Sequence, residues 1–145
     1  MPLDWNATRF CRIGGVTANK INCAADGGSS GSATTASNVN NGAWHHIALT
    51  STSNSQIIYF DGIQEGTASE TLDTGSGVID IGRNTLNQFY LDGIVDEVRV
   101  YNRVLSSDEI KRLYKMGSTF VINKPRTDTL KDGLVGYWSF DGPDM

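Results

Sequence analysis

The chain has 145 residues, of which 39% are hydrophobic and only 19% charged, and it carries a formal net charge of −4. That length suits one domain, and 16 glycines among many Ser, Thr and Asn residues indicate a turn-rich β protein rather than a helical bundle. The acidic balance leaves no excess of basic residues to neutralise phosphates, which argues against a nucleic-acid partner. The apolar runs are too short to span a bilayer, so no membrane insertion is expected.

The two cysteines lie in a segment whose pattern predicts a β-hairpin. In R-F-C-R-I-G-G-V-T-A-N-K-I-N-C, a turn near Thr17 pairs Ile13 with Ile21 and Cys11 with Cys23. Opposed cysteines on adjacent antiparallel strands lie close enough to form a disulfide. Two reduced cysteines that pack as small hydrophobes are the other interpretation, and the pattern leaves both open.

Short apolar runs separated by Gly, Asn, Asp and Ser recur along the chain with the spacing of a sandwich or barrel. The clearest cover residues 10–13, 20–24, 44–50, 56–60, 77–81 and 93–101. Asp61-Gly62 is the two-residue signal of a type I′ turn, which joins antiparallel strands. The Gly-, Ser- and Thr-rich stretch 26–38 indicates a surface loop that leads into an edge strand.

One segment, Ser106 to Gly117, has helical character. Ser106 and Glu109 have capping-box spacing, acidic residues precede basic ones, and Gly117 provides a C-terminal stop. The pattern predicts a short amphipathic helix that packs on the sandwich. A polar linker containing a proline then leads to a last predicted strand in L-V-G-Y-W-S-F-D-G.

Four motifs occur in order over residues 42–114: G-A-W-H-H-I-A-L-T, I-I-Y-F-D-G, I-D-I-G-R and Y-L-D-G-I-V-D-E-V-R-V-Y-N-R-V-L-S-S-D-E-I-K-R-L-Y. Together they resemble the laminin-G-like jelly-roll family of the concanavalin A-like lectin/glucanase superfamily. The resemblance implies an all-β antiparallel sandwich with one short C-terminal helix. It also implies an extracellular or cell-surface module with carbohydrate or protein ligands and often a calcium ion.

The ends of the chain depart from the family pattern. A segment resembling G-L-V-G-Y-W-S-F-D-G opens the domain in the family, whereas here it closes the chain. We therefore expect residues 1–122 to form the rear portion of one repeat, and residues 123–145 to be a linker and an opening-type strand. That strand completes the same sandwich or pairs with another copy. Unpaired sheet edges tend to be covered, so a homo-oligomer formed through strand pairing is expected.

Asp96 is the candidate metal ligand. By the two-residue period it shares a row with Val98 and Val100 and should be buried, where a carboxylate needs a cation, hydrogen bonds or an Arg partner. In related sandwiches an Asp in this motif holds a structural calcium together with oxygens of the opening strand. The resemblance therefore implies Asp96, Asp141 and the Gly142 carbonyl as calcium ligands. Calcium prefers about six to eight oxygens, more than these supply, so backbone hydrogen bonding by Asp96 stays an alternative.

No catalytic constellation is apparent. His45 and His46 are adjacent on a predicted strand and point to opposite faces, so they do not ligate one ion, and one should pack inward with a satisfied hydrogen bond. Glycoside hydrolysis needs two carboxylates across a cleft, and the E-x-D-x-x-E string of the glucanase relatives does not occur. Nucleophile elbows, phosphate-binding loops and zinc spacings do not occur either. The protein is predicted not to be an enzyme.

Flat aromatic side chains stack on the C–H faces of sugars. Phe89 and Tyr90, in the loop N-Q-F-Y, are the candidate ligand-binding pair. The predicted function is a non-catalytic binding or adhesion module for carbohydrate or a surface protein. A purely structural, self-associating repeat is the main alternative, and a degenerate glycoside hydrolase is the remote one.

Overall fold

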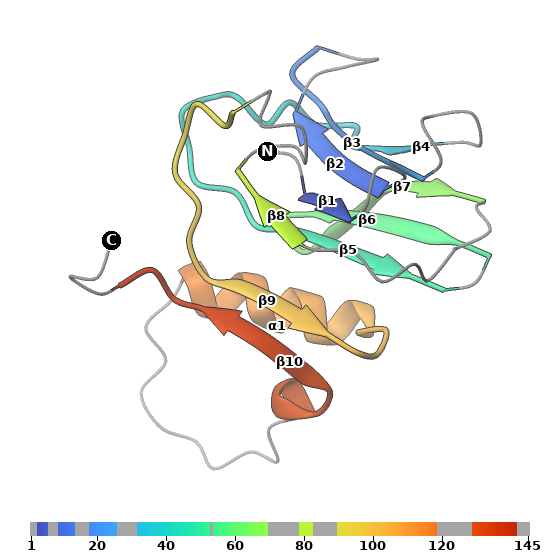
Figure 1. Ribbon diagram of the computed structural model, residues 1–145, viewed down its shortest axis with the longest axis vertical. Helices are drawn as coiled ribbons and strands as arrows, with labels where there is room; N and C mark the ends of the chain where they lie inside the picture. The colour runs from blue at the N-terminus through green and yellow to red at the C-terminus, as the bar shows by residue number, and fades with distance from the viewer. Residues whose placement is uncertain are drawn as a thin grey trace.

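The computed structural model describes residues 3–5, 9–13, 18–25, 32–52, 54–69, 79–82, 90–118 and 129–141. The strands are β1 (Leu3–Trp5), β2 (Arg9–Ile13), β3 (Ile21–Ala25), β4 (Ser32–Thr34), β5 (Ile47–Ser51), β6 (Gln56–Phe60), β7 (Ile63–Ala68), β8 (Ile79–Ile81), β9 (Val98–Tyr101) and β10 (Leu134–Trp138). The helix is α1 (Ser107–Ser118), and one 3₁₀ turn covers Thr129–Lys131 (Figure 1).

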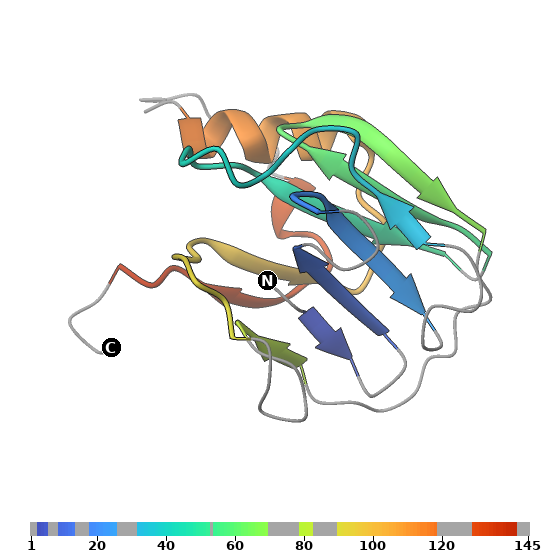
Figure 2. The same ribbon diagram turned by 90° about the horizontal axis from the view of Figure 1, so that it is seen from above.

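Antiparallel pairing joins these strands into three sheets. Their orders are β4-β3-β2-β1-β8, β5-β6-β7 and β10-β9. The five-stranded sheet and α1 lie on opposite sides of the β5-β6-β7 sheet (Figure 2). The predicted fold class is confirmed: antiparallel sheets packed face to face, with one helix. The edge strand β4 lies within the segment 26–38 that is predicted as a surface loop, and Ala33 and Thr35 are buried, so the loop prediction is wrong for residues 32–35; residues 26–31 lie outside the described ranges.

Strand β6 is covered on both faces. Ile58 is fully buried and packs with Cys23 and other residues of the five-stranded sheet. Its neighbour Tyr59 points the other way and packs with Ile110 and Leu113 of α1. Because successive strand residues face opposite sides, a strand between two layers needs apolar residues at consecutive positions. This explains why I-I-Y-F, residues 57–60, is a continuous apolar run rather than an alternating one.

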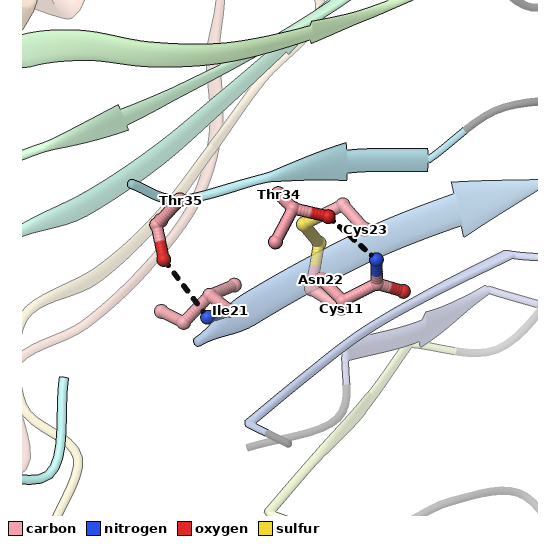
Figure 3. The surroundings of a disulfide bond; sticks show 6 residues. All are labelled: Cys11, Ile21, Asn22, Cys23, Thr34 and Thr35. Atoms are coloured by element: carbon pink, nitrogen blue, oxygen red, sulfur yellow. Dashed lines mark hydrogen bonds between the residues drawn. A yellow bond between two sulfur atoms is a disulfide. The ribbon is translucent and has the colours of Figure 1, made fainter. Parts of the chain in front are cut away.

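The β2–β3 hairpin has the predicted register. Ile13 pairs with Ile21 and Cys11 with Cys23, and the structure joins the two cysteines by a disulfide (Figure 3). Around it, the Ile21 N–H donates to Thr35 Oγ1 at 3.0 Å, a contact that ties β3 to the segment after β4 (Figure 3). The bridge lies in the core between the five-stranded and three-stranded sheets.

Removing this disulfide should lower the free energy of unfolding by about 3 kcal/mol, because the cross-link restricts the unfolded chain. Urea denaturation of a Cys11→Ala/Cys23→Ala variant measures the effect. Reductant should bring the wild type close to the variant and leave the variant unchanged. A wild-type midpoint that does not respond to reductant would contradict the disulfide.

Asp61 and Gly62 form the predicted turn between β6 and β7. Both have positive φ, 50° and 78°, as a type I′ turn requires. Gly62 also lies against the helix, because a Cβ atom there would come within 3.2 Å of the Tyr114 ring. The turn therefore closes the hairpin and seats α1 on the sheet.

Helix α1 begins with the predicted capping box. The Glu109 N–H donates to Ser106 Oγ at 3.3 Å, and the Ser106 N–H donates to Glu109 Oε2 at 2.9 Å. Ile110 and Leu113 face the β5-β6-β7 sheet. None of the helices in the described ranges has the length and apolar character needed to cross a membrane. The role of α1 is thus to pack on the sandwich.

Candidate functional site on the β9–β10 pair

Strand β10 pairs with β9 of the same chain. Leu134 lies opposite Tyr101 and Trp138 opposite Val98, with an irregularity between Leu134 and Gly136. Figure 1 shows β10 beside β9 on the side of α1 that faces the viewer. In this structure the opening-type strand predicted near the C-terminus therefore folds back onto its own chain.

An arginine fastens the segment that leads into β10. Arg103 donates two hydrogen bonds to the Glu109 carboxylate, at 3.0 and 2.8 Å. The same guanidinium donates to the Thr129 carbonyl at 2.5 Å and to the Asp132 carbonyl at 2.6 Å. We call these contacts the Arg103 clamp. Hydrogen bonding from Arg103, followed by the Ser106 N–H, holds the pKa of the Glu109 carboxyl well below its usual range, so the clamp is an ionic contact.

Close packing also holds residues 129–138 in place, in addition to the Arg103 clamp. Leu130, which belongs to the 3₁₀ turn, is buried in a cluster with Ile110 and Leu113 of α1. Gly133 has φ 74°, and a Cβ atom there would come within 2.6 Å of Asn102 Oδ1. Only glycine fits this position without strain. The surface formed by β9, its following loop and α1 is thus a specific seat for residues 129–138.

Trp138 forms an aromatic surface on one face of the pair. Its ring lies against Gly136, where a Cβ atom would come within 2.7 Å of Cη2 and Cζ3. Trp138 remains 45% exposed, and its strand partner Val98 is half-buried beside it. We call Trp138, Gly136 and Val98 the aromatic platform. One side of the indole is supported by backbone and much of the rest is open to solvent.

The opposite face carries a polar ladder. The Arg99 guanidinium lies 4.7 Å from the centre of the Tyr137 ring and forms an ion pair with Glu97. The Tyr137 hydroxyl donates to Glu97 Oε1 at 2.6 Å, and this hydrogen bond is the main cause that raises the pKa of Tyr137. Because β9 and β10 share these contacts, the ladder fixes the register that places Trp138.

Comparison with known proteins identifies the fold family. A sequence model described as the concanavalin A-like lectin/glucanases superfamily, of laminin-G type, matches residues 7–111. The chain belongs to this superfamily. No curated protein matches it in sequence. This concanavalin A-like domain is similar to the solved structure of an S-layer domain-containing protein from Clostridium thermocellum, at 26% identity and a TM-score of 0.45. The match covers 75% of this chain and 58% of that structure.

The candidate calcium ligands of this concanavalin A-like domain fall at one end of the pair. Since Trp138 pairs with Val98, the residues before β9 and after β10 lie at the same end, and Asp96 and Asp141 are both exposed there. Gly142 lies outside the described residues. Nowhere in the described ranges do three or more acidic, His or Cys residues form a group suited to a metal ion. The donors are of the type calcium prefers, but two carboxylates fit it only in part.

The predicted burial of Asp96 is wrong. Glu97 has φ 55°, and β9 begins only at Val98, so the two-residue alternation does not extend back to Asp96. Asp96 is exposed, as is Ile94, and Asp96 Oδ1 accepts the Glu97 N–H at 2.8 Å. The alternative in which Asp96 accepts a backbone hydrogen bond is therefore the one observed.

Exposed aromatics occur at several places in this concanavalin A-like domain. Tyr90 is exposed, whereas Phe89 lies outside the described residues. Trp44 is 67% exposed in the irregular loop before β5. Sequence reasoning chose Phe89 and Tyr90 rather than Trp138, because the support of Trp138 by Gly136 depends on tertiary structure. The only sequence signal for it is the spacing of Gly and Trp two positions apart on one strand face.

The two histidines have different neighbours, although they lie just before β5 rather than on a strand as predicted. His45 lies 2.9 Å from Asp61 Oδ2 through Nδ1 and stacks on Phe60. His46 faces Tyr114, with ring centres 6.2 Å apart. His46 Nδ1 is buried and has no hydrogen-bond partner among the described residues. The two imidazoles lie just before β5 and contact different neighbours, and they belong to no metal-binding group among the described residues.

His46 should make stability depend on pH. Burial, the largest cause, lowers the pKa of His46 below 6.5; the charge of Asp61 opposes this change, and the charge of Arg99 adds to it. Between the pKa of His46 in the folded state and 6.5, the unfolded state binds more protons than the folded state. The contribution of neutral His46 to stability is therefore fully present above pH 6.5 and is lost as the pH falls toward the folded-state pKa. Denaturation curves of wild type and His46→Gln, measured from neutral pH into the acid range, should differ in slope. Parallel curves would contradict this assignment.

Proposed function

We propose that this concanavalin A-like domain is a non-catalytic carbohydrate-binding module and that the aromatic platform is its contact surface. The observation that carries the proposal is the Trp138 ring, which rests on Gly136 and leaves 45% of the residue exposed. A flat, apolar ring of this kind matches the C–H face of a pyranose. Half-buried Val98 extends the apolar surface beside it.

Preorganisation favours Trp138 over the more exposed Trp44. Trp138 sits on a paired strand and is held by contact with Gly136, whereas Trp44 lies in a loop without regular structure. A side chain that is already ordered loses less conformational entropy on binding. The platform also depends on the Arg103 clamp, because the clamp holds the segment that carries Trp138.

Four carboxylates in the described part of the chain are engaged in structural contacts, which makes them unsuited to catalysis. Asp61 accepts the His46 N–H, and Glu65 accepts two hydrogen bonds from Ser37. Glu97 is paired with Arg99 and Glu109 with Arg103. Glycosidases need one carboxylate free to donate a proton and a second free to act as nucleophile or base. These four acids are instead engaged in contacts that hold the fold together.

A glycan array followed by titration of the strongest ligand tests the proposal. Trp138→Ala should weaken binding by at least about tenfold, which corresponds to ~1.4 kcal/mol. Trp44→Ala is the matched control and should bind like the wild type. Unchanged melting temperatures would show that both variants are folded. A blank array, or equal losses in both variants, would contradict the assignment to Trp138.

The disulfide supports a place outside the cytoplasm. Cys11 and Cys23 are bonded and buried in the core. Structural disulfides persist in oxidising compartments and are rare in the reducing cytosol. We therefore propose that the module acts at the cell surface or in the extracellular space, where glycans are accessible.

Calcium at Asp96 and Asp141 is a separate proposal on which carbohydrate binding does not rest. A cation there would neutralise two exposed carboxylates at one end of the β9–β10 pair. Added calcium should raise the melting temperature by several degrees, because a ligand that binds only the folded state stabilises it. Chelator should reverse the shift, and Asp96→Asn should abolish it. A melt indifferent to calcium and chelator would remove the metal.

A further inference from the structure

We infer that β10 also forms the interface between two copies of this chain, through antiparallel pairing of the two β10 strands at their outer edges. The result is a four-stranded sheet in the order β9-β10-β10-β9 across the two copies. This interface goes beyond carbohydrate binding, and each stands if the other fails. The partner is a second copy of the same chain because the outer edge of β10 is complementary to itself.

The outer edge of β10 has no partner strand among the described residues. Within the described ranges β10 pairs only with β9, on one edge, and Figure 1 shows it as the outermost strand of its sheet. Val135, Tyr137 and Trp138 are all exposed. The strand sequence L-V-G-Y-W contains no charged residue and no proline, two of the devices that keep edges from pairing, and its irregularity is confined to the start, between Leu134 and Gly136. Such an edge is a template for another strand.

Antiparallel pairing about Gly136 gives matched neighbours. In that register Val135 lies opposite Tyr137 of the second copy, and symmetry provides this pair twice, whereas the irregularity between Leu134 and Gly136 takes Leu134 out of the alternation. Aromatic residues beside aliphatic ones are favourable cross-strand pairs. The two Gly136 residues meet at the symmetry axis, where the absence of a side chain removes steric conflict. A two-fold contact of this kind closes on itself and produces a dimer rather than a filament.

Charges at the ends of the strand select the antiparallel arrangement. Lys131 precedes β10 and Asp141 follows it, and both are exposed. Antiparallel pairing brings Lys131 toward Asp141 of the second copy, and symmetry provides this contact twice. Parallel pairing would instead place lysine beside lysine and aspartate beside aspartate, which is unfavourable.

Analytical ultracentrifugation over a concentration series tests the interface. The wild type should show a monomer–dimer equilibrium. Val135→Lys should leave a monomer, because it places charge in the edge. Lys131→Glu and Asp141→Lys should each weaken the dimer several-fold, because two attractive contacts become repulsive. The combined Lys131→Glu/Asp141→Lys variant should restore it. Lys111→Glu, the same charge change on an exposed face of α1, is the control and should leave the dimer unchanged.

Cross-linking separates edge pairing from exchange of whole β10 strands. A mixture of Val135→Cys and Tyr137→Cys single variants should form a disulfide-linked heterodimer on oxidation. Exchange would instead link Arg99→Cys of one copy to Tyr137→Cys of another, since these positions face each other across β9 and β10. A wild type that stays monomeric at millimolar concentration overturns the inference. So does a cross-link found only with Arg99→Cys, or a double charge variant that fails to recover.

Discussion

Replacing Gly66 with alanine is expected to lower the free energy of unfolding by about 3 kcal/mol or more. Gly66 lies on β7 where that strand crosses β4. A Cβ atom there would come within 2.3 Å of the Thr34 carbonyl oxygen, 2.9 Å of the Thr34 nitrogen and 2.9 Å of Ile58 Cγ2. Two of these atoms belong to backbone and cannot rotate away. The added methyl group must therefore push the two main sheets apart.

Gly117→Ala is the matched control for this substitution. Gly117 lies in α1, and nothing would come within 4 Å of an added Cβ atom. Alanine favours a helix over glycine, so this variant should be unchanged or more stable by up to about 1 kcal/mol. Urea denaturation of both variants measures the difference. Equal midpoints would mean that β4 and β7 do not approach each other as closely as the structure has them.

Loss of the Arg103 clamp should release β10 from its seat. Arg103→Ala leaves the Glu109 carboxylate and the carbonyls of Thr129 and Asp132 without their charged donor. Hydrogen-exchange protection of the Leu134–Trp138 amides should fall by at least about tenfold, because unpaired acceptors favour the open state. Protection in β5 and β6, whose strand pairing does not involve the clamp, should be retained.

Two further variants test the cause of this release. Arg103→Lys keeps the charge but lacks the planar fork that engages a carboxylate and two carbonyls at once, so it should also lose protection in β10. Lys111→Ala removes an exposed cation from α1 and should have no effect. If Arg103→Ala left β10 fully protected, Leu130 and the polar ladder would be sufficient to hold the strand without the clamp.

Local features of the sequence predicted much of the fold. The shared centre of Cys11–Cys23 and Ile13–Ile21 sets the register of the hairpin. Asp61-Gly62 predicts the turn between β6 and β7, because a type I′ turn needs positive φ at both positions. The helix cap depends on two residues three positions apart. Each of these features is determined by residues close together in sequence, which is why pattern alone was sufficient.

The candidate site was less predictable because it depends on residues far apart in sequence. The Arg103 clamp joins the start of α1 to carbonyls of Thr129 and Asp132, and no short-range pattern marks that contact. Periodicity also misplaced Asp96, since the positive φ of Glu97 breaks the alternation just before β9. That Trp138 rests on Gly136 was visible in sequence only as a glycine two positions away. The exposure of Trp138 also depends on which parts of the chain pack over β10, and local sequence does not show this.

The indole NMR signals test the carbohydrate platform most directly. The chain contains three tryptophans, so its spectrum has three indole N–H signals that single substitutions assign. Titration with the strongest glycan from the array should shift the Trp138 signal progressively and leave those of Trp5 and Trp44 in place. A titration in which Trp44 or Trp5 shifts while Trp138 stays fixed would contradict the assignment of the binding surface to β10.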